Sequence, residues 1–317
     1  MKNPIGGYFS LELAFYDEYH KDALRLNTGR NCLEYILRVR QYKKVMIPYY
    51  TCDSILEPFN KLNVDYDFYH INIDLELEEL PNLQGNEALL YTNYFGLKQR
   101  YVELLAKFYG SQLIIDNTQA FYAKPIPGID TFYSCRKFFG VPDGAYLYTD
   151  QSLNIQLEQD QSFGRVSHLV KRIDLSPEEG FCDFHQNDKA LSNLPIRRMS
   201  KLTERMMQSI DYKAVAQQRR ANYRLLDVAL RHDNDIVLPL EETAVPMVYP
   251  FLVPNKGLRD KLIENKIFVV RYWSNVLDWT KPDDIDYLLV SQMQPLPIDQ
   301  RYGEEEMRFI INIIKKF

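Results

Sequence analysis

The sequence predicts an α/β protein with a mixed, mostly parallel sheet in a large domain and a smaller C-terminal α+β domain. Two observations predict this class. Between residues 45 and 148, short apolar runs alternate with helical patterns, which is typical of a sheet with crossover helices. After Asp150 the pattern changes, because a polar, irregular stretch leads into a long helical segment and then into shorter mixed elements. We therefore expect a large domain over residues 1–210 and a small domain over residues 211–317.

The expected elements of the large domain can be given in chain order. Apolar residues recur at helical spacing over residues 11–23 and again over 32–40, after a turn at 27–31. Helical patterns at 54–62 and 100–109 lie between some of the later apolar runs. A short segment joins the last two runs, so we expect an antiparallel neighbour there. The runs expected to be strands are residues 45–47, 64–69, 88–91, 113–115, 131–133 and 145–148.

The C-terminal part is expected to mix helices and strands. A helical pattern covers residues 201–232, and a second one covers 257–265. Apolar runs at 236–238, 246–253 and 267–272 supply the expected β part. Residues 304–316 form an amphipathic pattern, which predicts a final helix.

Composition excludes several classes of protein. The 317 residues carry a net charge of -5, which argues against a general nucleic-acid binder with a basic face. No apolar run reaches the length of a membrane span, and the N-terminus lacks the pattern of a signal peptide. The cysteines are scattered and form neither a disulfide framework nor a metal-ligand spacing, so we expect a cytoplasmic protein without a metal site. They are Cys32, Cys52, Cys135 and Cys182.

The first candidate site residue is Asp116, which ends the apolar run at 113–115. Ligands of open α/β sheets gather at the carboxyl ends of strands, and an acid there can face a cationic ring nitrogen. Gln119 follows closely and could reach a neighbouring ring oxygen. Taken alone, Asp116 could equally cap a following helix.

The second candidate is Lys137, which follows the run at 131–133 and lies among aromatic residues. Partial burial would lower the pKa of its amine and free it to form a Schiff base. Ser134 could donate a hydrogen bond to a phosphate. Ser-x-x-Lys is also the nucleophile motif of acyl-serine hydrolases, and Tyr91-Thr92-Asn93 resembles the Tyr-x-Asn element of those enzymes. Here, however, this element precedes Ser-x-x-Lys, which is the wrong order, and no Lys-Thr-Gly occurs.

The third candidate is the turn Thr28-Gly29-Arg30 at a helix start. Free backbone N–H groups at a helix N-terminus and the helix dipole together make a phosphate cradle. Glycine also lets the backbone approach a ligand closely. Such turns are common, so this turn alone is a weak indication of a phosphate site. Its position in the chain before Asp116 and Lys137 makes it more informative.

These elements, in this order, resemble those of the DegT/DnrJ/EryC1/StrS family of sugar aminotransferases. That family has the type I fold of pyridoxal phosphate (PLP) transferases. The Asp-x-x-Gln of residues 116–119 and the Ser-x-x-Lys of residues 134–137 are the most specific part of the resemblance. Further matching stretches are Leu26-Asn27-Thr28-Gly29-Arg30, Ile47-Pro48-Tyr49-Tyr50-Thr51, Asn93-Tyr94-Phe95-Gly96, the remainder of 134–144, and Leu296-Pro297-Ile298.

The resemblance implies an enzyme, a cofactor and a role for each matched residue. Lys137 would hold PLP as a Schiff base and shuttle protons, Asp116 would pair with the ring nitrogen, and Gln119 would bind the ring oxygen. Thr28, Gly29, Arg30 and Ser134 would surround the phosphate. The implied reaction moves an amino group from an amino acid, with glutamate expected, to a keto sugar expected to be nucleotide-linked. A homodimer with active sites at its interface is implied as well.

Two departures from the family pattern leave a second interpretation open. Cys52 stands where the family usually has an aromatic residue that stacks on the PLP ring. The resemblance therefore implies that the ring packs against Cys52, or that another aromatic residue stacks on it, with Tyr49, Tyr50 and Tyr94 as candidates. Ile196 stands where the family usually has an asparagine that reaches the partner's phosphate. The alternative function is therefore a PLP-fold protein that binds the cofactor or a sugar ligand without turnover, as a regulator. Lys137 favours the enzyme.

Overall fold

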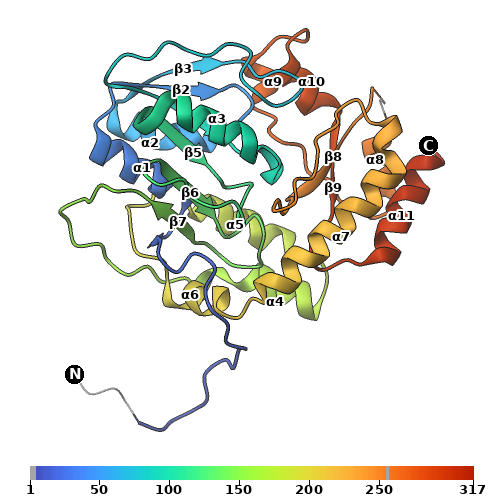
Figure 1. Cartoon of the computed structure of the whole chain (residues 1–317). Helices are drawn as coiled ribbons and strands as arrows, with labels where there is room; N and C mark the ends of the chain where they lie inside the picture. Colours follow the sequence, from blue (N-terminus) through green and yellow to red (C-terminus); the bar gives the residue numbers. More distant parts are fainter. Residues whose placement is uncertain (1–4, 255–256) are drawn as a thin grey trace.

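The computed structural model describes residues 5–254 and 257–317, and within them a seven-stranded sheet organises the N-terminal half of the chain (Figure 1). The strand order is β1-β7-β6-β5-β4-β2-β3. This mixed α/β architecture confirms the predicted fold class. The strands are β1 (Leu24–Leu26), β2 (Lys44–Pro48), β3 (Asp65–Tyr69), β4 (Glu87–Thr92), β5 (Leu113–Asp116), β6 (Asp130–Ser134) and β7 (Ala145–Tyr148).

The central strands are parallel and the strands at one side are antiparallel. β3, β2, β4, β5 and β6 run in one direction, and β7 returns against β6. β1 then pairs antiparallel with β7. The antiparallel pair expected from the short connection after β6 is therefore confirmed.

Both faces of the sheet are buried, which explains the near-continuous apolar runs. Along β5, Leu113 and Ile115 point into one core cluster, whereas Ile114 points into the other. This alternation follows from the two-residue period of a strand. The cluster that contains Ile114 is closed by α1 (Gly29–Arg40) and α2 (Leu56–Leu62). The opposite cluster includes residues of α3 (Gln99–Tyr109) and extends into the C-terminal part.

The C-terminal part contains the antiparallel pair β8 (Val248–Leu252) and β9 (Met293–Pro297). The long helix α7 (Tyr212–Leu230) packs on β8 and on α11 (Glu304–Lys315), as Figure 1 shows at the right of the molecule. No helix in residues 5–254 and 257–317 is long and apolar enough to cross a membrane. The remaining helices are α4 (Ser167–Asp174), α5 (Phe181–Ala190), α6 (Lys201–Met207), α8 (Leu258–Glu264), α9 (Val276–Trp279) and α10 (Ile285–Gln292).

Several predicted elements are wrong. Residues 11–23 form no helix. Residues 11–18 have no regular structure, and Tyr16 N donates to Gln208 O at 2.7 Å, outside the segment. Residues 236–238 and 267–272 are apolar but lie in irregular chain that packs into the core. The helix predicted over 201–232 is broken between α6 and α7, where Asp211 caps α7. α4 and α5 lie after Asp150, in the stretch that the sequence predicted to be irregular.

Candidate active site

The candidate site lies at the carboxyl edge of the parallel strands. Thr92 ends β4, Asp116 ends β5 and Ser134 ends β6. Thr92 and Asp116 are direct neighbours in the register. The hydrogen bonds of the parallel sheet continue one residue further, since Asn93 N donates to Asp116 O at 3.0 Å and Asn117 N donates to Phe132 O at 2.8 Å. This is the edge at which open α/β sheets bind ligands.

Asp116 is a buried carboxyl group without an ion pair among the described residues. Its Oδ1 accepts a hydrogen bond from Thr118 N at 2.8 Å. Burial raises the pKa of Asp116 to about 6, against the opposing effects of the hydrogen bonds from Thr118 and the charge of Lys137. No helix follows directly, so this contact closes a local turn and does not cap a helix. The carboxyl group lies close enough to Lys137 to feel its charge.

The N-terminus of α1 adjoins the turn after Asp116. Thr28 caps the helix, and its side chain accepts a hydrogen bond from Asn31 N at 3.1 Å. Within the described residues, the amides of Gly29 and Arg30 have no acceptor, as expected for the first turn of a helix. A methyl group added at Gly29 would lie 3.5 Å from Thr118 Cγ2. Two free donors therefore lie beside the Asp116 turn.

The side chain of Arg30 is already engaged and offers the site only its backbone. Its Nη1 atom donates to Leu191 O at 3.0 Å and to Ser192 Oγ at 3.2 Å, and it lies 3.4 Å from Glu57 Oε2. These bonds join the start of α1 to the chain after α5. The backbone N–H of Arg30, like that of Gly29, remains free at this end of α1 among the described residues.

Lys137 lies in the turn after β6, with Ser134 half-buried at the strand end. Phe138 N and Phe139 N both donate to Cys135 O, at 3.3 and 3.0 Å, and shape this turn. The lysine side chain is exposed and forms no ion pair with any residue that the structure describes. The partial burial expected from its aromatic neighbours is therefore not seen.

Gln119 is buried beside the same edge. Its Oε1 accepts a hydrogen bond from Phe95 N at 3.0 Å, while its Nε2 donor has no partner among the described residues. Thr92 Oγ1 is also buried without a partner there. Buried polar groups of folded proteins are nearly always paired, so each of these two atoms needs a partner that the described residues do not supply.

Cys52 stands apart from this group. It follows β2, and its Sγ accepts a hydrogen bond from Ser54 Oγ at 3.1 Å. The segment before it is fixed by the C-terminal part, where Asn275 Nδ2 donates to Thr51 O at 2.9 Å and Trp273 packs on Tyr50. The structure thus places Thr28 and Gly29 beside the turn that carries Asp116 and Gln119, with Lys137 on the turn after the neighbouring strand β6. Among the described residues, no hydrogen bond joins Cys52 to this group.

Asn27 was missed as a site residue in the sequence. It is fully buried, and its carbonyl accepts a hydrogen bond from Gly144 N at 2.8 Å. Its side chain donates to Pro195 O at 3.0 Å and accepts from Arg197 N at 3.2 Å. Asn27 therefore links the start of α1 to Gly144, at the end of residues 134–144, which we call the Lys137 segment. Only its place beside Thr28 could have suggested this role.

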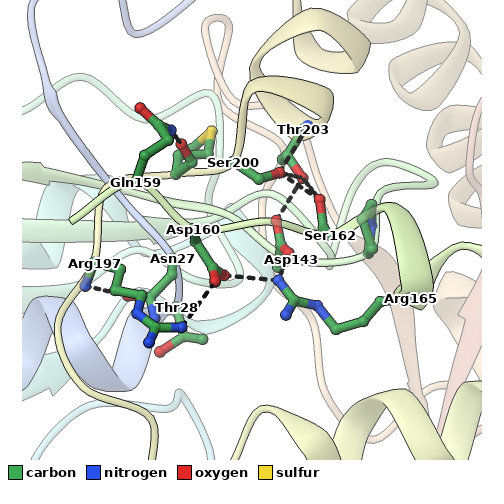
Figure 2. Close-up of polar contacts among 12 residues, drawn as sticks. Asn27, Thr28, Asp143, Gln159, Asp160, Ser162, Arg165, Arg197, Ser200 and Thr203 are labelled. Carbon is green, nitrogen blue, oxygen red and sulfur yellow. Dashed lines mark hydrogen bonds and ion pairs between the residues drawn. The ribbon is translucent and has the colours of Figure 1, made fainter.

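A largely buried polar network holds the same segment at Asp143 (Figure 2). Arg165 bridges Asp143 and Asp160, and Asp143 also accepts a hydrogen bond from Thr203. Arg197 Nη1 lies 3.4 Å from Asp160 Oδ1, so this arginine is engaged within its own chain. Burial raises the pKa of Asp143, while the hydrogen bonds from Arg165 and Thr203 oppose the change.

Comparison with known proteins supports the fold. No protein-family model matches the sequence, and no curated protein matches it. Solved structures do match. A DegT/DnrJ/EryC1/StrS aminotransferase from Brucella abortus is 16% identical, with a TM-score of 0.62 over 93% of this chain and 85% of the other.

Two further structures show the same likeness. The sugar aminotransferase CalS13 from Micromonospora echinospora is 11% identical, with a TM-score of 0.61 over 93% of this chain and 87% of its own. NtdA from Bacillus subtilis, solved with bound cofactor PMP, is 13% identical, with a TM-score of 0.60 over 92% of this chain and 73% of its own. The chain therefore has the fold of the DegT/DnrJ/EryC1/StrS sugar aminotransferases.

Proposed function

We propose that the protein is a PLP-dependent aminotransferase that moves an amino group from an amino acid to a keto sugar. Glutamate is the expected donor, and the sugar is expected to be nucleotide-linked. One observation carries the proposal. The buried Asp116 carboxyl group lies at a strand end within reach of the charge of Lys137, beside the free amides of α1. The likeness to sugar aminotransferases of the same fold supports it.

The residues at this edge fit PLP chemically. The Nε2 atom of Gln119 is a buried donor that needs an acceptor, which the phenolic oxygen of PLP would provide. Asp116 is a buried acid that needs a cation, which a protonated ring nitrogen would provide. The amides of Gly29 and Arg30, with the Ser134 hydroxyl, would hold the phosphate.

In this proposal each residue has a distinct task. PLP, when bound, supplies an electron sink and carries the amino group from donor to acceptor. Lys137 would hold the cofactor through Nζ and would move the proton at the substrate carbon. Asp116 would keep the ring nitrogen protonated, because the ion pair stabilises the charged form of both partners. Gln119 would orient the ring through Nε2.

We propose a homodimer whose interface borders this site. α4, α5 and the segment before them expose a group of large apolar side chains, which would be unusual on the surface of a monomer. Two contacts join α5 to the Lys137 segment: Arg136 pairs with Asp188 at 2.9 Å, and Asn187 Nδ2 donates to Pro142 O at 2.8 Å. Light scattering that gives a monomer at micromolar concentration would contradict this. The exposed residues are Phe163, Val170, Ile173, Leu175, Phe181 and Phe184.

The first half of the reaction, from the amino donor to the cofactor, can be tested without knowing the sugar. Purified protein is loaded with PLP and mixed with glutamate, and the formation of pyridoxamine phosphate and 2-oxoglutarate is followed. We expect both products in equal amounts, and neither with Lys137→Ala. A protein that takes up PLP but converts none of a panel of amino acids would instead be the binding protein without turnover.

A further inference from the structure

Arg219 is a buried cation without a carboxylate partner. It lies on α7 with 2% of its surface exposed, and it forms no ion pair within residues 5–254 and 257–317. Burial lowers the pKa of its guanidinium to about 10. Removing a charge from water costs several kcal/mol unless other groups replace the water, so the hydrogen bonds of Arg219 need an explanation.

Backbone carbonyls take the place of the missing anion. The Nη1 atom of Arg219 donates to Pro246 O at 3.3 Å and to Met247 O at 3.0 Å. Its Nη2 atom donates to Phe138 O at 3.3 Å, and its Nε atom donates to Gln300 Oε1 at 2.9 Å. One guanidinium therefore joins three separate parts of the chain.

The first of these parts carries Lys137. Phe138, the next residue, gives its carbonyl to Arg219 and also to Gln300 Nε2 at 2.9 Å, and its ring lies under the guanidinium at 4.5 Å. The three groups form a closed triangle. Asn222, one turn further along α7, fixes the loop of Gln300 by donating to Ile298 O at 3.1 Å and to Tyr302 O at 2.9 Å.

The second part leads to Gln119. Met247, whose carbonyl is held by Arg219, donates its own N–H to Phe95 O at 2.9 Å. The N–H of Phe95 then donates to Gln119 Oε1 at 3.0 Å. Arg219 therefore supports two candidate cofactor contacts. One is Lys137, on the turn after β6, and the other is Gln119, on the turn after β5.

We propose that Arg219 is a positioning residue that sets the place of Lys137 relative to Gln119. It acts through Phe138 and Met247 and needs no contact with the cofactor. Its role for PLP rests on the proposed function, whereas its hold on the Lys137 turn does not. A flexible lysine cannot replace it, because only the planar fork of arginine reaches several fixed acceptors at once.

Arg220 provides a matched control. It is the next residue of α7, and its Nη1 atom also donates to two backbone carbonyls, Glu241 O at 3.1 Å and Ala244 O. It makes no hydrogen bond to Phe138 among the described residues. Arg219→Lys and Arg220→Lys therefore both remove guanidinium bonds to backbone carbonyls from one helix, and only the first removes a support of the Lys137 turn.

Two measurements are made on each variant. Amide hydrogen exchange is followed in the protein without PLP, at the N–H groups of Phe138 and Phe139 that donate to Cys135 O. We expect Arg219→Lys to speed exchange there by about tenfold, the equivalent of one lost hydrogen bond, and Arg220→Lys to leave it unchanged. With PLP added, Arg219→Lys should also slow covalent capture of the cofactor, as trapped with borohydride.

Equal exchange in the two variants would overturn the proposal. If Arg219→Lys does not fold, Arg219→Gln replaces it, because a neutral amide avoids a buried unpaired charge and still removes the guanidinium that reaches Phe138 O and Met247 O together. Unchanged exchange in Arg219→Gln would then overturn the proposal equally. Wild-type protein that takes up no PLP would instead refute the proposed function, and the exchange data would still decide the role of Arg219 at the turn.

Discussion

Gln119 accepts a hydrogen bond from the backbone N–H of Phe95 at 3.0 Å and thereby keeps its own Nε2 donor buried and unpaired among the described residues. A buried donor without an acceptor costs about 1–3 kcal/mol, so the fold carries this cost until a ligand relieves it. The orientation of the amide is set by Phe95 and not by any ligand. The site thus presents a buried donor in the protein without a ligand.

Gln119→Glu tests this donor. The change keeps an acceptor for Phe95 N and puts a carboxylate oxygen in the place of Nε2, facing the phenolic oxygen of PLP. We expect PLP affinity to fall by about tenfold or more, because a charge-assisted hydrogen bond is replaced by repulsion. Affinity is read from the quenching of intrinsic fluorescence. Gln112→Glu, at the other end of β5, is the control and should bind PLP as wild type does.

Asp116→Asn should separate stability from activity. The pKa of Asp116 is raised to about 6 in the folded protein, above the unfolded value, so the carboxylate costs stability once the pH rises through this range. Without PLP, we expect the variant to be more stable than wild type by about 3 kcal/mol near pH 8, with no gain near pH 4. Urea unfolding measures this, and amino transfer should be largely lost. A variant that is less stable near pH 8 would contradict the assignment.

The phosphate cradle can be tested by removing one N–H group. Proline is tolerated at the first position of a helix, and the extended backbone of Thr28 suits a following proline. Gly29→Pro should therefore keep α1 but weaken PLP binding by about tenfold, and Gly29→Ala, which keeps the N–H, should not. Pyridoxal, which lacks the phosphate, should bind both variants equally. A loss shared by PLP and pyridoxal would point to distortion instead.

Gly144 should be required for the fold of the Lys137 segment. Its φ is +102°, and an added Cβ would lie 2.8 Å from Thr203 Cγ2 and 3.2 Å from Cys135 Sγ. We expect Gly144→Ala to lower the free energy of unfolding by about 2–4 kcal/mol, because strain and overpacking add. At Gly140 an added Cβ would meet only Leu169 Cδ2 at 3.7 Å, so Gly140→Ala should change stability by less than about 0.5 kcal/mol. Equal effects in urea unfolding would refute the steric argument.

The sequence predicted the central strands because their apolar runs are local and buried on both faces. Asp116 and Lys137 could be singled out because each directly follows such a run. The tie between Asn27 and Gly144 and the tie between Arg219 and Phe138 could not be predicted, since each joins residues far apart in the chain. The helical pattern at 11–23 misled because periodicity does not reveal which surface is available for packing. Leu11, Phe15 and Tyr16 remain exposed there.

The most direct test of the central claim is the site of covalent PLP attachment. Protein incubated with PLP is reduced with borohydride, digested and mapped by mass spectrometry, with the exposed Lys124, in the connection between β5 and β6, as an internal comparison. We predict a pyridoxyl group on Lys137 alone, with a violet absorbance band that disappears on reduction and is absent from Lys137→Ala. A pyridoxyl group on another lysine, or none on Lys137 at saturating PLP, would contradict the account.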